Sequence, residues 1–167
     1  MISADAALSL GCGLCLWVAA WRDLRGFVIP NALSLALLAL FLARATVLAP
    51  EEAAARALAG AAMLAGAFAM YLTGRLGAGD AKLLAAFTPH VPIALLSPYL
   101  FALAISGAAS VAMLALMRRA MVSAEPQVAG DRAGPAGWAV WRERGRVPFG
   151  FAISAAGACA LAAAAAL

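Results

Sequence analysis

The sequence predicts an all-α integral membrane protein with about six transmembrane helices, the fourth of them short or kinked. Three observations lead to this fold class. The 167 residues are 66% hydrophobic, and their mean hydropathy is +0.95. Only 12% of the residues are charged, against roughly 25% in ordinary soluble domains. Finally, the apolar stretches are long and are separated by short polar segments, as expected of helices that cross a bilayer.

Six apolar segments have about the length that a membrane helix needs, which is roughly 20 residues. We place them near 5–21, 30–48, 53–73, 81–96, 98–117 and 148–166. Pro89 and Pro92 interrupt the fourth, so we expect it to be kinked or broken, and its boundary with the fifth stays open. Residues 1–167 are expected to form one membrane-embedded domain with a polar cytoplasmic loop at about 118–146.

The basic residues predict how the protein lies in the membrane. All but two of the 12 lysines and arginines fall in the loops after the first, third and fifth segments, and the two exceptions are Arg44 and Arg56. Loops rich in lysine and arginine stay in the cytoplasm. We therefore expect both termini outside the cytoplasm. The net charge of +4 flanks apolar segments and does not form a basic domain, so no nucleic-acid partner is expected.

The cysteines predict packing and not metal chemistry. Cys12, Cys15 and Cys159 all lie within apolar stretches. Cys12 and Cys15 spell a CxxC pair, but no second pair or neighbouring histidine accompanies it, as a zinc site would require. We therefore expect no metal and no cofactor.

Two carboxylates stand apart from the six others in the chain. Asp23 follows the first apolar segment and Asp80 precedes the fourth, so both lie at the same predicted membrane face. Two carboxyls held close together share a proton and titrate as a unit. Such a pair can activate water, one carboxylate acting as general base and the other as general acid. Taken alone, Asp23 could instead pair with Arg22 or Arg25, and Asp80 could cap a helix.

Three motifs in order resemble the type IV prepilin peptidases, which are GxGD aspartic membrane proteases. "DLRGFVIPN" (23–31) is similar to the family's D-x5-IPN stretch, and "GAGDAK" (77–82) is similar to its GxGD-x-K motif. "VPFGF" (147–151) resembles the Pro-Phe-Gly segment that opens the family's last helix. The resemblance implies that Asp23 and Asp80 are the catalytic residues. Phe151 departs from the glycine or proline often found there.

The resemblance also implies the substrate and the cellular setting. Substrates of this family are prepilins and pseudopilins, whose short basic leader is cut after a glycine at the cytoplasmic face of the bacterial inner membrane. The chain is similar to the short form found in Flp, or tight-adherence, pilus systems, with the pilus assembly machinery as a possible further partner. Paired CxxC motifs of longer members are absent, so N-methylation is not expected. The expected substrate-binding residues are Gly77, Gly79, Lys82, Pro148, Phe149 and Gly150. Lys82 and Arg25 are expected either to tune the aspartates or to anchor the protein at lipid headgroups.

Two other functions remain open at this stage. A small proton- or ion-coupled transport component could use the same aspartates, because ionisable residues and broken helices also mark transport paths. That function predicts polar residues near mid-membrane, where the sequence has few. A catalytically silent pilus assembly factor is the other alternative. The sequence does not indicate which pilin is cleaved or the oligomeric state.

Overall fold

The computed structural model of this chain describes residues 4–26, 29–123 and 149–166. Within these ranges the chain is all helical, with no β-strand, which confirms the predicted fold class. Its α-helices are α1 (Ala4–Gly26), α2 (Asn31–Ala45), α3 (Pro50–Leu72), α4 (Ala78–Phe87), α5 (Leu96–Ser123) and α7 (Phe149–Ala164). Two short 3-10 turns, η1 (Thr88–His90) and η2 (Ile93–Leu95), join α4 to α5.

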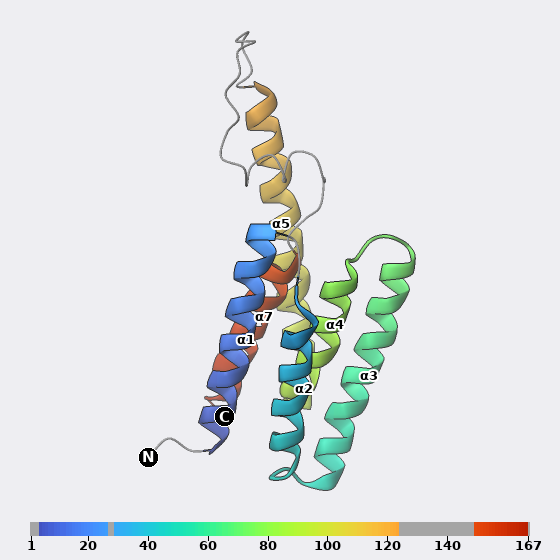
Figure 1. Cartoon of the computed structure of the whole chain (residues 1–167), viewed down its shortest axis with the longest axis vertical. Coiled ribbons are helices and arrows are strands. Elements are labelled where there is room, and N and C mark those ends of the chain that lie inside the picture. Colours follow the sequence, from blue (N-terminus) through green and yellow to red (C-terminus); the bar gives the residue numbers. More distant parts are fainter. Residues whose placement is uncertain (1–3, 27–28, 124–148, 167) are drawn as a thin grey trace.

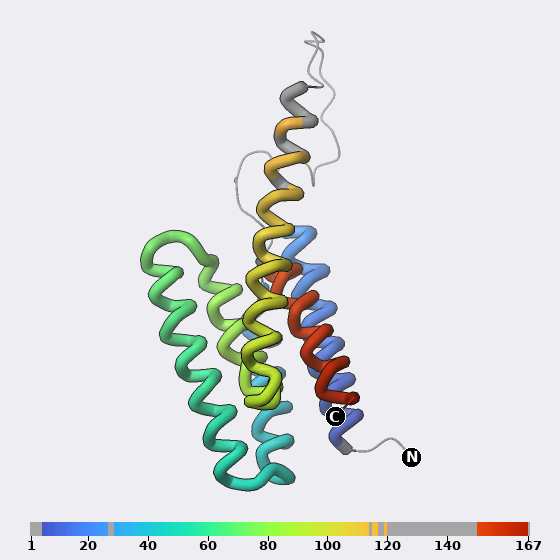
Figure 2. The backbone as a smooth tube through the Cα atoms, turned by 180° about the vertical axis from the view of Figure 1, so that it is seen from behind, coloured from blue at the N-terminus to red at the C-terminus, as the bar shows by residue number. Residues whose placement is uncertain are grey.

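The helices run alternately up and down and form a bundle (Figure 1). Helix α1 packs against α7 and α2, while α7 also packs against α5. Helix α4 lies inside the bundle, in contact with α2, α3 and α7. The upper part of α5 extends beyond the other helices (Figure 2). Because the helices alternate in direction, α1 ends toward the same end of the bundle at which α2, α4 and α7 begin. We call this end the aspartate end.

The inner positions of the helices form a tightly packed core. Leu16, Leu37, Leu83, Phe87 and Ile153 are each at most 1% exposed. Close approach depends on small residues: a Cβ added at Gly157 would lie 2.6 Å from the Leu16 side chain and 3.0 Å from Phe87. Helices in membranes associate through such close packing, because lipid tails are as apolar as the side chains.

The outer positions carry large apolar side chains, which is the reverse of a soluble protein's surface. They are spread over every long helix and include Leu14, Trp17, Leu35, Leu42, Leu58, Phe68, Phe101, Ile105 and Leu116, each at least half exposed. Among the described residues, three helices are long and apolar enough to cross a membrane, Asp5–Gly26, Pro50–Leu72 and Ile93–Met113. The apolar helices Asn31–Ala45 and Gly150–Ala164 are shorter. This pattern indicates membrane insertion.

The fourth helix is shorter than the segment 81–96 that the sequence predicted. Helix α4 has 10 residues and ends at Phe87, and the chain then continues through η1 and η2. Pro89 and Pro92 explain the break, because proline has no amide to donate and its ring clashes with the preceding turn. Helix α5 begins at Leu96 and continues to Ser123, past the predicted end of the fifth segment. The rest of the predicted loop at 118–146 lies outside the described residues.

A candidate active site at one end of the bundle

Asp23 lies in the last turn of α1 and is buried, with 5% of the residue exposed. Its Oδ2 atom accepts a hydrogen bond of 2.8 Å from the backbone N–H of Gly150. Gly150 is the second residue of α7, where backbone amides have no partner within the helix. The first turn of α7 thus supplies the hydrogen-bond donor that this buried carboxylate needs.

Asp23 forms no ion pair with another described residue. Among the residues that the structure describes, the ion pairs are Arg44–Asp5 and Arg56–Glu52, both at the opposite end of the bundle. The guanidinium of Arg25 lies over the ring of Trp21, 4.0 Å from its centroid. This is a cation–π contact. The structure therefore favours neither the ion-pair interpretation of Asp23 nor direct contact between Arg25 and the aspartates.

Asp80 lies in the first turn of α4, three residues after the N-cap residue Gly77. Its carboxylate reaches back to the backbone amide of Gly77, as the third helical residue does in a capping box. The other oxygen, Oδ1, is buried and has no hydrogen-bond partner in the described part of the chain. Asp80 is thus not the N-cap residue itself, and half of its carboxylate is left without a partner.

The two carboxyls lie close enough together to interact electrostatically. Three different helices meet at this point, because α1 carries Asp23, α4 carries Asp80 and the first turn of α7 donates to Asp23. This juxtaposition agrees with the expectation that helix packing brings the two aspartates to one depth.

Glycines make this approach possible. A Cβ added at Gly77 would lie 2.8 Å from Oδ2 of Asp80, and one at Gly150 would lie 2.9 Å from Oδ2 of Asp23. Real side chains essentially never approach so closely. A Cβ at Gly79 would lie 3.2 Å from Cβ of Ile29, so Gly79 allows the segment before α2 to lie against the start of α4. The first two sequence motifs therefore touch each other.

The remaining expected site residues are less closely grouped. Lys82 is exposed, and its Nζ atom donates a hydrogen bond of 3.1 Å to Oδ1 of Asn31. It therefore bridges α4 and α2. Phe149 is the first residue of α7, and its side chain lies outside what the structure describes, as does the whole of Pro148. Among the described residues, no group of three or more His, Cys, Asp or Glu side chains is arranged to hold a metal ion.

The sequence did not predict the contact between α7 and Asp23. The sequence indicates a substrate contact for Gly150, which stays a prediction, and the structure adds that its amide donates to Asp23. The sequence does carry a signal for this contact, because a glycine at the start of a helix is useful where another group must approach the backbone closely. That signal alone does not say which group approaches.

The comparison with known families agrees with this geometry. The model of the type IV leader peptidase family matches residues 10–116, well over half of the chain, and this range includes both Asp23 and Asp80. The chain belongs to the type IV leader peptidase family, and it is therefore a peptidase of that general kind. The match does not reach the α7 segment. No curated protein and no solved structure matches the chain.

Proposed function

We propose that this protein is an aspartic endopeptidase that removes the leader peptides of prepilins and pseudopilins, with Asp23 and Asp80 as its catalytic pair. The observation that carries the proposal is the convergence of a buried carboxyl, Asp23, and a half-buried one, Asp80, without a basic partner in the described residues, at one end of a membrane bundle. Family membership supports the same conclusion. The Flp type of prepilin is the proposed substrate class.

The surroundings of the two carboxyls differ, and from this difference we assign the roles of general base and general acid. Asp23 accepts a backbone N–H, and such a hydrogen bond stabilises the ionised form. Asp80 also accepts a backbone N–H, from Gly77, but its other oxygen is buried without a partner among the described residues, and an unpartnered buried oxygen favours the protonated form. In the proposed resting state, Asp23 is therefore ionised and Asp80 carries the shared proton. Environments that separate two carboxyls in this way define the base and the acid.

The reaction then follows ordinary acid–base steps. Asp23 removes a proton from a water molecule, whose oxygen attacks the carbonyl carbon of the scissile bond, while Asp80 gives its proton to the carbonyl oxygen. A neutral tetrahedral diol results. As the C–N bond breaks, the diol returns a proton to Asp80, and the proton on Asp23 passes to the leaving nitrogen. The pair ends in its starting state, with one proton and one charge.

The hydrophobic part of the substrate also needs a place beside the aspartates. An apolar groove of about 650 Å³ lies between α2, α3 and α4, and it includes Asn31, Lys82, Leu38, Ala61 and Pro89. It starts at Lys82, two residues after Asp80, and follows the helices toward the other end of the bundle. We propose that the hydrophobic helix of the prepilin lies there. The peptide bond just before that helix would then reach the aspartate end.

The predicted topology supports a cytoplasmic site. All the basic residues except Arg44 and Arg56 lie in the loops and helix ends that the sequence assigns to the side of the aspartates, and segments rich in lysine and arginine remain in the cytoplasm. The protein would accordingly lie in the bacterial inner membrane, with both termini on the non-cytoplasmic side.

The test is co-expression with a candidate Flp prepilin, followed by mass spectrometry of the pilin to detect loss of the leader. We expect Asp23→Asn and Asp80→Asn to lower the cleavage rate at least about a hundredfold, since general acid–base catalysis contributes about 10²–10⁴-fold. Glu51→Gln, which neutralises an exposed carboxylate at the other end of the bundle, is the matched control. Wild-type cleavage by either aspartate variant would refute the assignment.

A transport component using the same aspartates is the alternative. It predicts aspartate-dependent proton or ion flux in proteoliposomes, with no cleavage of the prepilin by the wild-type protein. The silent assembly factor predicts neither flux nor cleavage.

A further inference from the structure

Two arginines are buried at the end of the bundle opposite the aspartates. Arg44 lies in the last turn of α2 and Arg56 lies in the first half of α3. Their side chains are only 5% and 8% exposed. Burying a charge costs several kcal/mol per ion, so a buried guanidinium needs good partners. The groups that surround these two arginines therefore determine whether the cost of burying them is offset.

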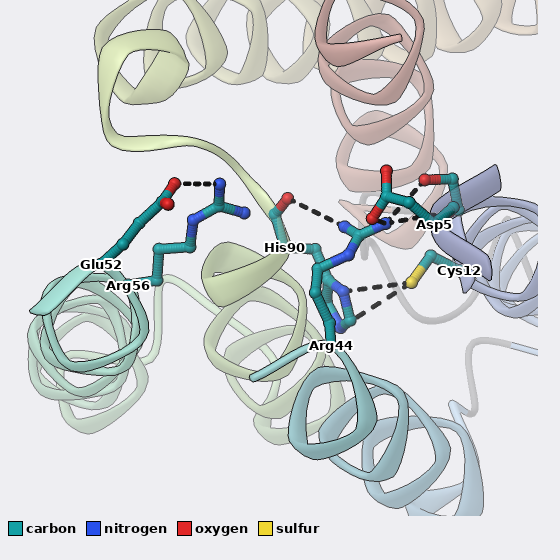
Figure 3. Close-up of polar contacts among 7 residues, drawn as sticks. Asp5, Cys12, Arg44, Glu52, Arg56 and His90 are labelled. Carbon is teal, nitrogen blue, oxygen red and sulfur yellow. Dashed lines mark hydrogen bonds and ion pairs between the residues drawn. The ribbon is translucent and has the colours of Figure 1, made fainter. Parts of the chain in front are cut away.

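Arg44 is held by several contacts, which Figure 3 shows. It forms an ion pair of 3.0 Å with Oδ1 of Asp5, and it donates hydrogen bonds of 2.7 Å to Oγ of Ser9 and 3.4 Å to the carbonyl of His90. Arg56 pairs with Glu52 one turn earlier in α3. Arg44 therefore ties α1, α2 and η1 together, whereas the hydrogen bond of Arg56 to a described residue stays within its own helix.

His90 adds no further charge to this cluster. Its Nε2 atom lies 2.9 Å from the carbonyl oxygen of Leu37, and an oxygen at this position can only accept, so Nε2 carries the hydrogen. Its Nδ1 atom lies 3.2 Å from Sγ of Cys12, whose thiol can then donate to it. Both ring nitrogens are thus satisfied in the neutral form, and the cluster contains two cations and two carboxylates.

The positive and negative groups of this cluster lie at different depths. The carboxylate side chains are far more exposed than the arginines, 69% for Asp5 and 43% for Glu52. A carboxylate that stays largely in solvent is screened by water, and so it leaves much of the cost of burying the arginine uncompensated. The cations lie inside and the anions lie at the rim.

Both guanidinium groups also keep unused donors. A guanidinium has five N–H donors. The Nε atoms of Arg44 and Arg56 are buried without a hydrogen-bond partner in the described part of the chain. Among the same residues, Arg56 donates only to Glu52. An additional acceptor group would satisfy donors that the protein itself does not.

A cavity of about 1310 Å³ opens beside these groups. One end is lined by Asp5, Ser9, Arg44, Glu52, Arg56 and His90. The rest of its wall is apolar and includes Leu10, Leu14 and Trp17 of α1 and Leu161 of α7. From Leu10 to Trp17 this wall extends roughly 10 Å along the helix, at 1.5 Å per residue. The cavity is thus polar at the end of the bundle and apolar toward its middle.

We propose that this cavity binds a zwitterionic aminophospholipid, one with a phosphate and a primary ammonium in its headgroup. The phosphate lies against Arg44 and Arg56, whose forked donors suit phosphate oxygens. The ammonium lies farther out, beside Asp5 and Glu52. One acyl chain follows the apolar wall of α1.

The order of the charges selects this lipid class. In such a headgroup the phosphate is the deeper charge and the ammonium is the outer one, which matches buried arginines and rim carboxylates. The cluster as a whole is neutral, and so is the headgroup. A singly anionic phospholipid would satisfy the arginines, but it would bring no cation to the two carboxylates.

The test is native mass spectrometry of the full-length protein in a neutral detergent, with phosphatidylethanolamine or phosphatidylglycerol of the same acyl chains added. The wild-type protein should retain phosphatidylethanolamine in preference. Arg56→Gln should weaken retention of both lipids about 10–100-fold, because a hydrogen bond to a charged group contributes about 1.5–3 kcal/mol and 1.4 kcal/mol is a factor of ten. Arg75→Gln, at the aspartate end, is the matched control and should retain both lipids as the wild-type protein does.

A second pair of variants tests the role of the carboxylates. Glu52→Gln should remove the preference for phosphatidylethanolamine while leaving phosphatidylglycerol bound, and Glu51→Gln, which does not line the cavity, should leave the preference unchanged. Thermal unfolding supplies a separate readout: the lipid should raise the Tm of the wild-type protein more than that of Arg56→Gln. A preference for phosphatidylglycerol, an equal effect of inorganic phosphate on the Tm, or undiminished lipid retention by Arg56→Gln would each overturn the proposal.

Discussion

Replacing Gly150 with alanine tests the proposed active site most directly, because it leaves both carboxyls in the sequence. The added Cβ would lie 2.9 Å from Oδ2 and 3.0 Å from Cβ and Cγ of Asp23. Since Asp23 is buried between α1 and α7, its side chain has to rotate away or α7 has to shift. In either case the 2.8 Å hydrogen bond from the Gly150 amide is lengthened or lost.

The magnitude follows from the kind of hydrogen bond that is disturbed. A hydrogen bond to a charged group contributes about 1.5–3 kcal/mol, which corresponds to about 10–100-fold in rate at 1.36 kcal/mol per factor of ten. Alanine is otherwise the better helix former, by roughly 0.5–1 kcal/mol, so any loss of activity would occur against an intrinsic preference for the variant. We therefore expect kcat/KM for leader removal to fall about 10–100-fold.

The assay is cleavage of a detergent-solubilised prepilin, with rates normalised to folded enzyme. Gly66→Ala is the matched control, because nothing lies within 4 Å of the Cβ that would be added there, and its kcat/KM should match that of the wild-type protein. If Gly150→Ala cleaves as fast as Gly66→Ala, then the amide of α7 does not hold Asp23 for catalysis and the reasoning fails.

Three further substitutions test other contacts. Gly77→Ala places a Cβ 2.8 Å from Oδ2 of Asp80, and it should lower kcat about 10-fold or more, because it disturbs the hydrogen bond to that carboxylate. An unchanged kcat would show that this hydrogen bond does not matter for catalysis. Ala61→Trp fills the groove between α2 and α3, so KM for a full-length prepilin should rise, whereas Ala62→Trp, outside the groove, should leave KM unchanged; equal KM values would exclude that groove. Gly157→Ala puts a Cβ 2.6 Å from the Leu16 side chain, and overpacking of this kind costs about 1–3 kcal/mol. It should lower Tm while kcat of the folded fraction remains normal, and a Tm at or above the wild-type value would show that α1 and α7 relax freely.

The sequence alone was sufficient for the fold class. It also predicted that Asp23 and Asp80 lie at one end of the bundle, while their catalytic role stays a prediction. Hydropathy and segment length are local properties, and for this reason they predicted an all-helical membrane protein and the weak fourth helix interrupted by Pro89 and Pro92. The pair Asp23 and Asp80 was also predictable, because each lies at the end of an apolar segment and alternating segments bring those ends to one membrane face. The exact ends of α4 and α5 were not, since they depend on how η1 and η2 pack.

Only the tertiary structure decided what each of these side chains meets. Whether Asp23 pairs with a neighbouring arginine or accepts the amide of Gly150 depends on how α1 is rotated relative to α7, and no local pattern encodes that rotation. The same holds for Arg44, which the sequence showed only as an exception to the distribution of basic residues and which the structure buries against α1 and η1. Residue spacing determines which helices exist and which ends meet, while the packing of side chains across helices determines which polar groups become partners.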